Sequence, residues 1–134
     1  MKVFIDTNIL ISAALNPTGT PALAYQKAVL YPNTAVICDV NLVELRRIFN
    51  IKFPHKLTTL ELFINSIISS FEVVDTPSRE VEDETRIRDI NDRPILRAAK
   101  LANVDILLTG DKDFLESNIT DPRIMTASEF LKSV

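Results

Sequence analysis

Short apolar segments alternate with longer segments of helical spacing, and this alternation limits the possible folds of the chain more than any other feature. The apolar segments are rich in β-branched residues and occupy 2–5, 34–38, 71–74, 105–109 and 124–125. They are apolar at consecutive positions, which is typical of parallel strands that are buried on both faces. The pattern therefore predicts an α/β fold, a three-layer α/β/α sandwich with a central, mostly parallel sheet.

Helices are expected between these strands because apolar residues recur there every three or four positions. Asp39 is the expected N-cap of the third helix, and Thr58 or Thr59 that of the fourth. The fourth helix is apolar enough to serve a protein interface or to pack in the core, and the second role is the better expectation. A charged stretch at 80–88 is expected to be a solvated helix or loop. The expected helices span 8–15, 20–30, 39–49, 58–70, 92–103 and 128–132.

Length and composition indicate one ordinary domain over residues 1–134. Apolar residues make up 46% of the 134 residues, enough for a core that needs no disulfide. The single cysteine, Cys38, is expected at a buried strand end and fits a reducing cytosol. We find no apolar run of about 18 residues and no secretory signal, so a cytoplasmic protein without a membrane span is expected.

The formal net charge of −3 argues against a protein that coats DNA or RNA. Such proteins hold phosphates with a surplus of lysine and arginine. The charge argues less strongly against an enzyme that acts on nucleic acid, because bound cations can cancel carboxylates locally.

Four acidic residues occupy positions next to the expected strands. Asp6 directly follows the first strand, and Asp111 lies two residues after the fourth. Asp92 begins the helix that leads into the fourth strand, and Glu44 lies in the second turn of the helix that leaves the second. Because ligands bind at the carboxyl ends of parallel strands, these four side chains are expected to meet at one sheet edge.

Each acid also has a structural explanation when it is considered alone. Asp6 and Asp92 could cap helices, Glu44 could pair with Arg47, and Asp111 could stabilise a turn. Together, however, four carboxylates repel one another unless a cation lies among them. Oxygen ligands favour Mg²⁺ or Mn²⁺, as one ion or two. The only histidine, His55, is expected at the surface, and no Ser-His or Cys-His pairing is evident.

Three blocks of sequence resemble the PIN-domain family of nucleases, in particular the toxin-like branch of toxin–antitoxin systems. They are VFIDTNIL at 3–10, VNLVELRRI at 40–48 and NDRPILRAAKLANVDILLTGDKDF at 91–114. The resemblance covers nearly the whole chain. It implies Mg²⁺- or Mn²⁺-dependent cleavage of single-stranded RNA that leaves a 3′-hydroxyl and a 5′-phosphate. It also implies a small antitoxin partner and a homodimer.

The resemblance assigns roles to individual residues. The catalytic, metal-binding acids are Asp6, Glu44, Asp92 and Asp111, and Asp113 matches a further acid beside them. Asp89 adds an acid nearby without changing the assignment. The polar residues expected to steady the acids are Thr7, Asn8 and Thr109.

Basic residues near the acids are possible contacts for RNA phosphates. Arg93, Arg97 and Lys100 form a stripe on the helix after Asp92, and Arg46 and Arg47 flank Glu44. A solvated helix face is the alternative explanation for each group. No aromatic platform for stacking bases is evident.

Two other functions are compatible with parts of the pattern. A non-catalytic PIN-like binding module would have lost one of the acids, and all are present. A haloacid-dehalogenase-like phosphatase would need a second aspartate two residues after Asp6, where this chain has Asn8. A receiver-like domain would need paired early acids and a late lysine at a strand end, which we do not find.

Overall fold

The computed structural model describes residues 1–133 and contains a five-stranded sheet in the order β3-β2-β1-β4-β5. All four strand pairings are parallel. The predicted α/β/α fold is confirmed. The strands are β1 (Lys2–Ile5), β2 (Thr34–Cys38), β3 (Glu72–Val74), β4 (Ile106–Leu108) and β5 (Arg123–Met125). The α-helices are α1 (Thr7–Leu15), α2 (Thr20–Val29), α3 (Asp39–Lys52), α4 (Leu57–Ser70), α5 (Arg93–Leu101), α6 (Lys112–Leu115) and α7 (Ala127–Lys132). Three 3₁₀ turns complete the described chain, η1 (Pro54–Lys56), η2 (Glu82–Arg86) and η3 (Ile90–Asp92).

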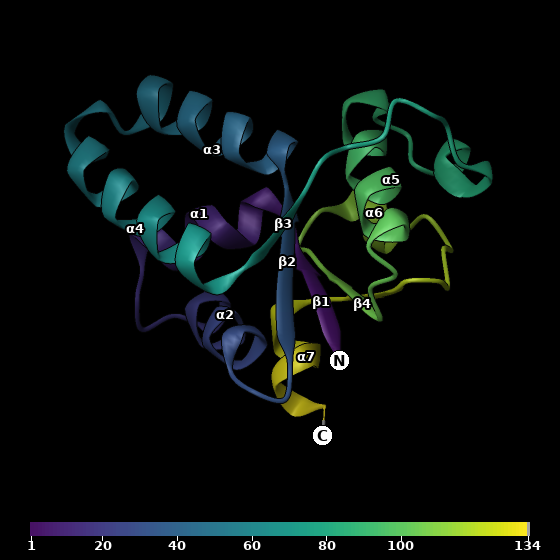
Figure 1. The fold of residues 1–134 in the computed structure, drawn as a ribbon, viewed down its shortest axis with the longest axis horizontal. Coiled ribbons are helices and arrows are strands. Elements are labelled where there is room, and N and C mark those ends of the chain that lie inside the picture. The colour runs from purple at the N-terminus through teal and green to yellow at the C-terminus, as the bar shows by residue number, and fades with distance from the viewer. Residues whose placement is uncertain (134) are drawn as a thin grey trace.

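The sheet separates two hydrophobic cores because successive side chains of a strand point to opposite faces. In β1, Val3 and Ile5 belong to the core covered by α1–α4 and α7. Phe4 belongs to the other core, which α5 and α6 cover. Figure 1 shows the sheet nearly edge-on, with α3 and α4 on one side and α5 and α6 on the other. The three layers follow from the central strands, which are apolar and buried at every position after the first residue of β1 and β2.

The strand order reverses at β1, which marks the carboxyl end of this strand as a place for ligands. The chain passes from β1 through α1 and α2 to β2 on one side, whereas β4 lies on the other side of β1. Parallel sheets bind ligands where the strand order reverses in this way. Asp6 directly follows β1 and Asp111 lies shortly after β4, so both lie at this edge of the sheet.

The helix starts differ from two of the predicted caps. Asp39 is the first residue of α3 and not its N-cap; its carboxylate accepts a hydrogen bond from the Thr76 backbone N–H at 2.8 Å. The N-cap is Cys38, a buried residue as predicted, whose backbone N–H donates to Asn41 Oδ1. α4 begins at Leu57, ahead of Thr58 and Thr59. Its apolar face packs in the core, as expected.

The charged stretch at 80–88 is not simply solvated, which corrects the sequence-based expectation. Glu84 is only 3% exposed, and its carboxylate accepts two hydrogen bonds from the Arg97 guanidinium, at 2.7 and 2.8 Å. Lys100 pairs with Asp83 at 2.8 Å in the same way. The stripe of basic residues on α5 therefore holds η2 against this helix. Tertiary charge pairing gives the stretch a fixed position that its own composition does not predict.

None of the helices in residues 1–133 has the length and apolar character needed to cross a membrane. His55 is exposed, as the sequence predicts.

Candidate active site

Asp6 lies at the centre of the candidate site, in the turn between β1 and α1, and is 7% exposed. Its Oδ1 accepts a hydrogen bond from the Thr7 backbone N–H at 2.8 Å, and its Oδ2 accepts one from the Thr109 hydroxyl at 2.8 Å. Burial raises the pKa of Asp6 to about 6 although both hydrogen bonds lower it, and the charge of Asp111 raises it further. Asp6 is the N-cap of α1. A capping role alone does not require a carboxylate that is buried and has a raised pKa, so capping does not fully explain this residue.

Asp92 ends η3 and occupies the N-cap position of α5, but its side chain accepts no hydrogen bond from the first helical turn. The pKa of Asp92 is raised to about 7. Burial is the largest cause, and the charge of Asp111 and a hydrogen bond with Asp111 raise the pKa further. Asp6 and Asp89 raise the pKa further. Asp92 is thus surrounded by negative charge, which is unfavourable for a purely structural carboxylate.

Glu44 projects from α3 toward the same group. Its pKa is raised mainly by burial and then by the charges of Asp6 and Asp89, whereas Arg47 lowers it. The alternative of a pair with Arg47 therefore describes only part of its surroundings. The carboxylates of α3, β1 and the segment before α5 share one electrostatic environment.

Asp89 and Asp113 join the cluster beside Asp92. One carboxylate oxygen from each of these three residues lies within 4.8 Å of the other two. Arg88 contacts Asp113 Oδ1 through its Nη2 at 2.9 Å and also pairs with Glu116 at 3.0 Å. Asp111 caps α6 by accepting a hydrogen bond from the Asp113 backbone N–H at 3.0 Å. The sequence shows Asp89 as a nearby acid, but only folding shows that it adjoins Asp92.

Uncharged polar side chains hold the acidic segments in place. Asn8 accepts a hydrogen bond from the Gly110 backbone N–H at 3.2 Å, and its amide donates to Asp6 Oδ2 at 3.4 Å. The Thr109 hydroxyl also accepts from the Asp111 backbone N–H at 3.0 Å. These contacts join the end of β1 to the end of β4, in the positions expected for Asn8 and Thr109.

Asn41 is a site residue that the sequence analysis missed. It is fully buried, and its amide donates to the Thr7 hydroxyl at 3.0 Å while its Oδ1 accepts from the Cys38 backbone N–H at 2.8 Å. It thereby fixes the first turn of α3 against Thr7, the residue that follows Asp6. Glu44 lies in the next turn of the same helix. Its position inside the matched block VNLVELRRI is the signal that could have identified it.

Comparison with known proteins agrees with this geometry. A family model described as the PIN domain matches residues 2–113 of the chain. The chain belongs to the PIN-domain family. One curated relative of this PIN domain, the uncharacterized protein MJ1680 of Methanocaldococcus jannaschii, is 26% identical over 98% of this chain and 90% of its own.

Solved structures share the fold of this PIN domain. VapBC2 from Rickettsia felis, solved with a DNA fragment from its promoter, matches with a TM-score of 0.70 and 19% identity over 94% of this chain and 98% of its own. FitAB bound to the IR36 DNA fragment matches with a TM-score of 0.66 and 18% identity over 93% of this chain and 94% of its own. FitAcB from Neisseria gonorrhoeae matches with a TM-score of 0.66 and 20% identity over 94% of this chain and 98% of its own.

The donor set of the PIN domain fits a hard divalent cation. The ligand atoms that the cluster offers are carboxylate oxygens, the type that Mg²⁺ and Mn²⁺ prefer. Burial, and then the charge of neighbouring carboxylates, raises the pKa values of Asp6 and Asp92. A cation among them would remove that penalty, so the residues present suit the metal that the family implies.

The arginines that were expected to contact RNA have different surroundings. Arg97 is engaged by the buried Glu84, and Arg46 pairs with Glu61 of α4. Arg93 donates to the Ile87 backbone carbonyl at 3.0 Å. Arg47 is exposed and close enough to lower the pKa of Glu44. Of the four, Arg47 and Arg93 retain the better position for a phosphate contact.

Proposed function

We propose that this chain, as one domain over residues 1–134, is a metal-dependent endoribonuclease that hydrolyses phosphodiester bonds of single-stranded RNA. The observation that carries the proposal is the cluster of carboxylates at one sheet edge, where oxygens of Asp89, Asp92 and Asp113 lie within 4.8 Å of one another. Three acids of this edge also have raised pKa values. The pKa is about 6 for Asp6, about 7 for Asp92, and above its ordinary value for Glu44. Perturbed acids gathered in a crevice are typical of catalytic sites.

Asp6, Glu44, Asp92, Asp111 and Asp113 are the proposed ligands of one or two Mg²⁺ or Mn²⁺ ions. When bound, such ions lower the pKa of a water molecule and stabilise negative charge on the phosphoryl and leaving oxygens. They also explain how a protein of net charge −3 approaches a polyanion.

The chain's own residues position the reaction. The Thr7 N–H and the Thr109 hydroxyl hold one oxygen each of Asp6, so its carboxylate orientation is fixed before a ligand arrives. Asn8 links that carboxylate to Gly110 and so to the Asp111 segment. Glu44, whose pKa is raised, holds the attacking water by accepting a hydrogen bond from it at a carboxylate oxygen. Arg47 and Arg93 contact the RNA phosphates on either side.

We further propose that the protein is a cytoplasmic toxin of a toxin–antitoxin pair, with a small antitoxin partner and a homodimeric state. The support is the shared fold with VapBC2 and FitAB, which were solved as complexes on DNA. The expected result in a bacterial host is arrested growth on expression of the wild type and normal growth with Asp6→Asn. Equal arrest by both proteins would contradict the toxin role.

The ribonuclease proposal is tested with a fluorogenic single-stranded RNA in the presence of Mg²⁺ or Mn²⁺. Cleavage is expected for the wild type and for the control Asp121→Asn, an exposed aspartate outside the cluster. Asp6→Asn and added EDTA should each reduce cleavage at least about a hundredfold, since each removes the charge stabilisation of the reaction. Activity that survives both changes would refute the proposal. Phosphate release from small phosphomonoesters in its place would favour the phosphatase alternative.

A further inference from the structure

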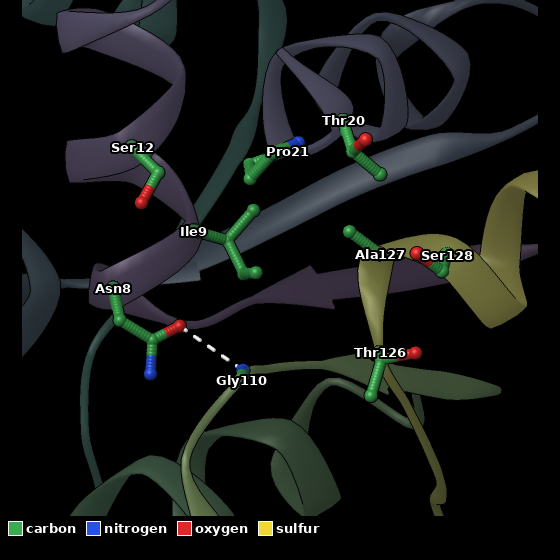
Figure 2. Close-up of a pocket in the computed structure, with 9 residues that line it drawn as sticks. All are labelled: Asn8, Ile9, Ser12, Thr20, Pro21, Gly110, Thr126, Ala127 and Ser128. Carbon is green, nitrogen blue, oxygen red and sulfur yellow. Dashed lines mark hydrogen bonds between the residues drawn. The ribbon is translucent and has the colours of Figure 1, made fainter.

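A cavity of about 370 Å³ opens beside the acidic cluster, between the first turns of α1, the start of α2 and the junction of β5 with α7. Figure 2 shows Ile9 reaching from α1 between Pro21 and Ala127. The volume falls within the range of small-molecule sites, roughly 300–1,000 Å³. The lining residues are Asn8, Ile9, Ser12, Thr20, Pro21, Gly110, Thr126, Ala127 and Ser128.

The cavity adjoins the candidate active site. Asn8 and Gly110 line it, and Figure 2 shows the hydrogen bond that joins them. The amide of the same Asn8 donates to Asp6 Oδ2 at 3.4 Å. Asn8 therefore lies between the cavity and the central carboxylate and contacts both, which places the cavity next to the position proposed for the scissile phosphate.

The chemistry of the lining differs sharply from that of the cluster. None of the nine lining residues carries a charge. Ile9, Pro21 and Ala127 supply apolar surface, and the exposed residues Ser12, Thr20 and Ser128 supply hydroxyl groups. Each hydroxyl offers one donor and two acceptor positions. Such a surface suits an uncharged group with apolar faces and polar edges and offers a phosphate no compensating cation.

We propose that this cavity binds the ribose and base of the nucleotide next to the scissile phosphate. The inference rests on the proposed ribonuclease function and gives that function a substrate subsite. No aromatic residue lines the cavity, so the base is recognised through its edges and through apolar contact with Ile9 and Ala127 rather than by stacking. Ribose hydroxyls and base edges bind the hydroxyls of Ser12, Thr20 and Ser128.

The test fills the cavity from two independent elements, with Ser12→Leu on α1 and Ser128→Leu on α7. Both serines are exposed, so neither substitution disturbs the core. Ser69→Leu on α4, another exposed serine, is the matched control outside the cavity. The affinity of each protein for a fluorescein-labelled single-stranded RNA is measured by anisotropy with Ca²⁺ present. Cleavage of RNA and of bis(p-nitrophenyl) phosphate, which has no nucleoside, is measured with Mn²⁺.

Both cavity variants are expected to raise the Kd for RNA at least about fivefold, whereas Ser69→Leu leaves it at the wild-type value. They should also lower the ratio of kcat/KM for RNA to kcat/KM for bis(p-nitrophenyl) phosphate about tenfold. Wild-type Kd and ratio in both variants, while the wild type binds and cuts RNA, would overturn the subsite alone. The same result combined with lost binding of a copurified antitoxin would assign the cavity to that protein and also overturn the subsite. A wild type that neither binds nor cuts RNA would overturn the proposed function itself.

Discussion

At the scale of single residues, the candidate site is built from groups whose ionised form is unfavourable in the folded protein. Asp92 and Asp6 have pKa values of about 7 and about 6 because burial and neighbouring acids disfavour their negative charge. A structural carboxylate such as Glu84 shows the opposite behaviour, since Arg97 lowers its pKa to about 2. The contrast separates acids that await a ligand from an acid that already has its partner.

Asp92→Asn is expected to stabilise the metal-free protein at about pH 8, by on the order of 1 kcal/mol after allowance for solvent screening. Asp92 ionises near 3.8 in the unfolded chain and near 7 in the fold. Its penalty on stability therefore grows as the pH rises from about 4 and is complete above about 7. Urea denaturation with EDTA at several pH values measures the difference, which should vanish near pH 4. A variant less stable than the wild type at pH 8 would contradict the cause given for the raised pKa.

Asn41→Ala is expected to destabilise the protein by about 1–3 kcal/mol, because it leaves the buried Cys38 N–H without an acceptor and removes the donor to Thr7. The matched control is Asn50→Ala on the same helix, whose exposed amide donates to the Arg46 carbonyl at 2.8 Å. Thermal unfolding followed by circular dichroism compares the two. Equal melting temperatures for both variants would show that Asn41 does not hold the start of α3.

At the scale of elements, the segment between β3 and α5 owes its position to charge pairs rather than to apolar packing alone. η2 is attached to α5 by the Glu84–Arg97 and Asp83–Lys100 pairs, and Arg93 donates to the carbonyl of Ile87. This segment leads directly to Asp89 and Asp92. The ion pairs of α5 therefore help to position the segment that carries Asp89 and Asp92.

Glu84→Gln is expected to cost about 3 kcal/mol of stability at about pH 6, because Arg97 keeps its charge in a site where it is only 17% exposed. Arg97 lowers the pKa of Glu84 from 4.5 to about 2. The stabilisation is therefore complete above about pH 4.5 and is lost as the pH falls through about 2. Urea denaturation should show the gap between wild type and variant narrowing over this interval.

The control for this experiment is Asp83→Asn, which removes the more exposed pair with Lys100 and should cost less stability than Glu84→Gln. A gap for Glu84→Gln that stays constant down to pH 2 would show that ionisation of Glu84 does not provide the stabilisation.

At the scale of the whole molecule, the parallel sheet brings acids from four distant segments to one edge of an acidic protein. β1 lies between β2 and β4, so the ends of these strands and the segments beside them meet there. The fold thus concentrates negative charge at a single crevice, where a divalent cation has its largest effect. The stability of the whole domain should consequently respond to such a cation.

Addition of Mg²⁺ or Mn²⁺ is expected to raise the melting temperature of the wild type by several degrees at millimolar concentration, since only the folded chain presents the site. The shift in melting temperature should be larger at about pH 8 than at about pH 5.5. At the lower pH, protons compete with the metal for the carboxylates of Asp6 and Asp92. Differential scanning fluorimetry measures it, with Asp6→Asn as the variant that loses the shift. Asp121→Asn serves as the variant that retains it, and an equal shift in both would place the cation elsewhere.

The sequence by itself determined the layers and the centre of the site. The apolar runs at 35–38 and 106–108 are typical of strands covered on both faces, and helical spacing between them supplies the covering layers. The acids at 6 and 111 follow such runs, so their place at the carboxyl edge was predictable from local pattern. The blocks around Asp6 and Asp92 also carried the family resemblance, which the family model confirms.

Only the tertiary structure decided which side chains meet across the chain. Local patterns do not encode pairing between remote segments, because that pairing depends on strand order and on the fit of whole faces. The contact of Arg97 with Glu84, the approach of Asp113 to Asp92, and the bridge from Asn41 to Thr7 all arise in this way. The cavity beside Asn8 likewise exists only because α1, α2 and α7 converge at the edge of the sheet where Asp6 lies.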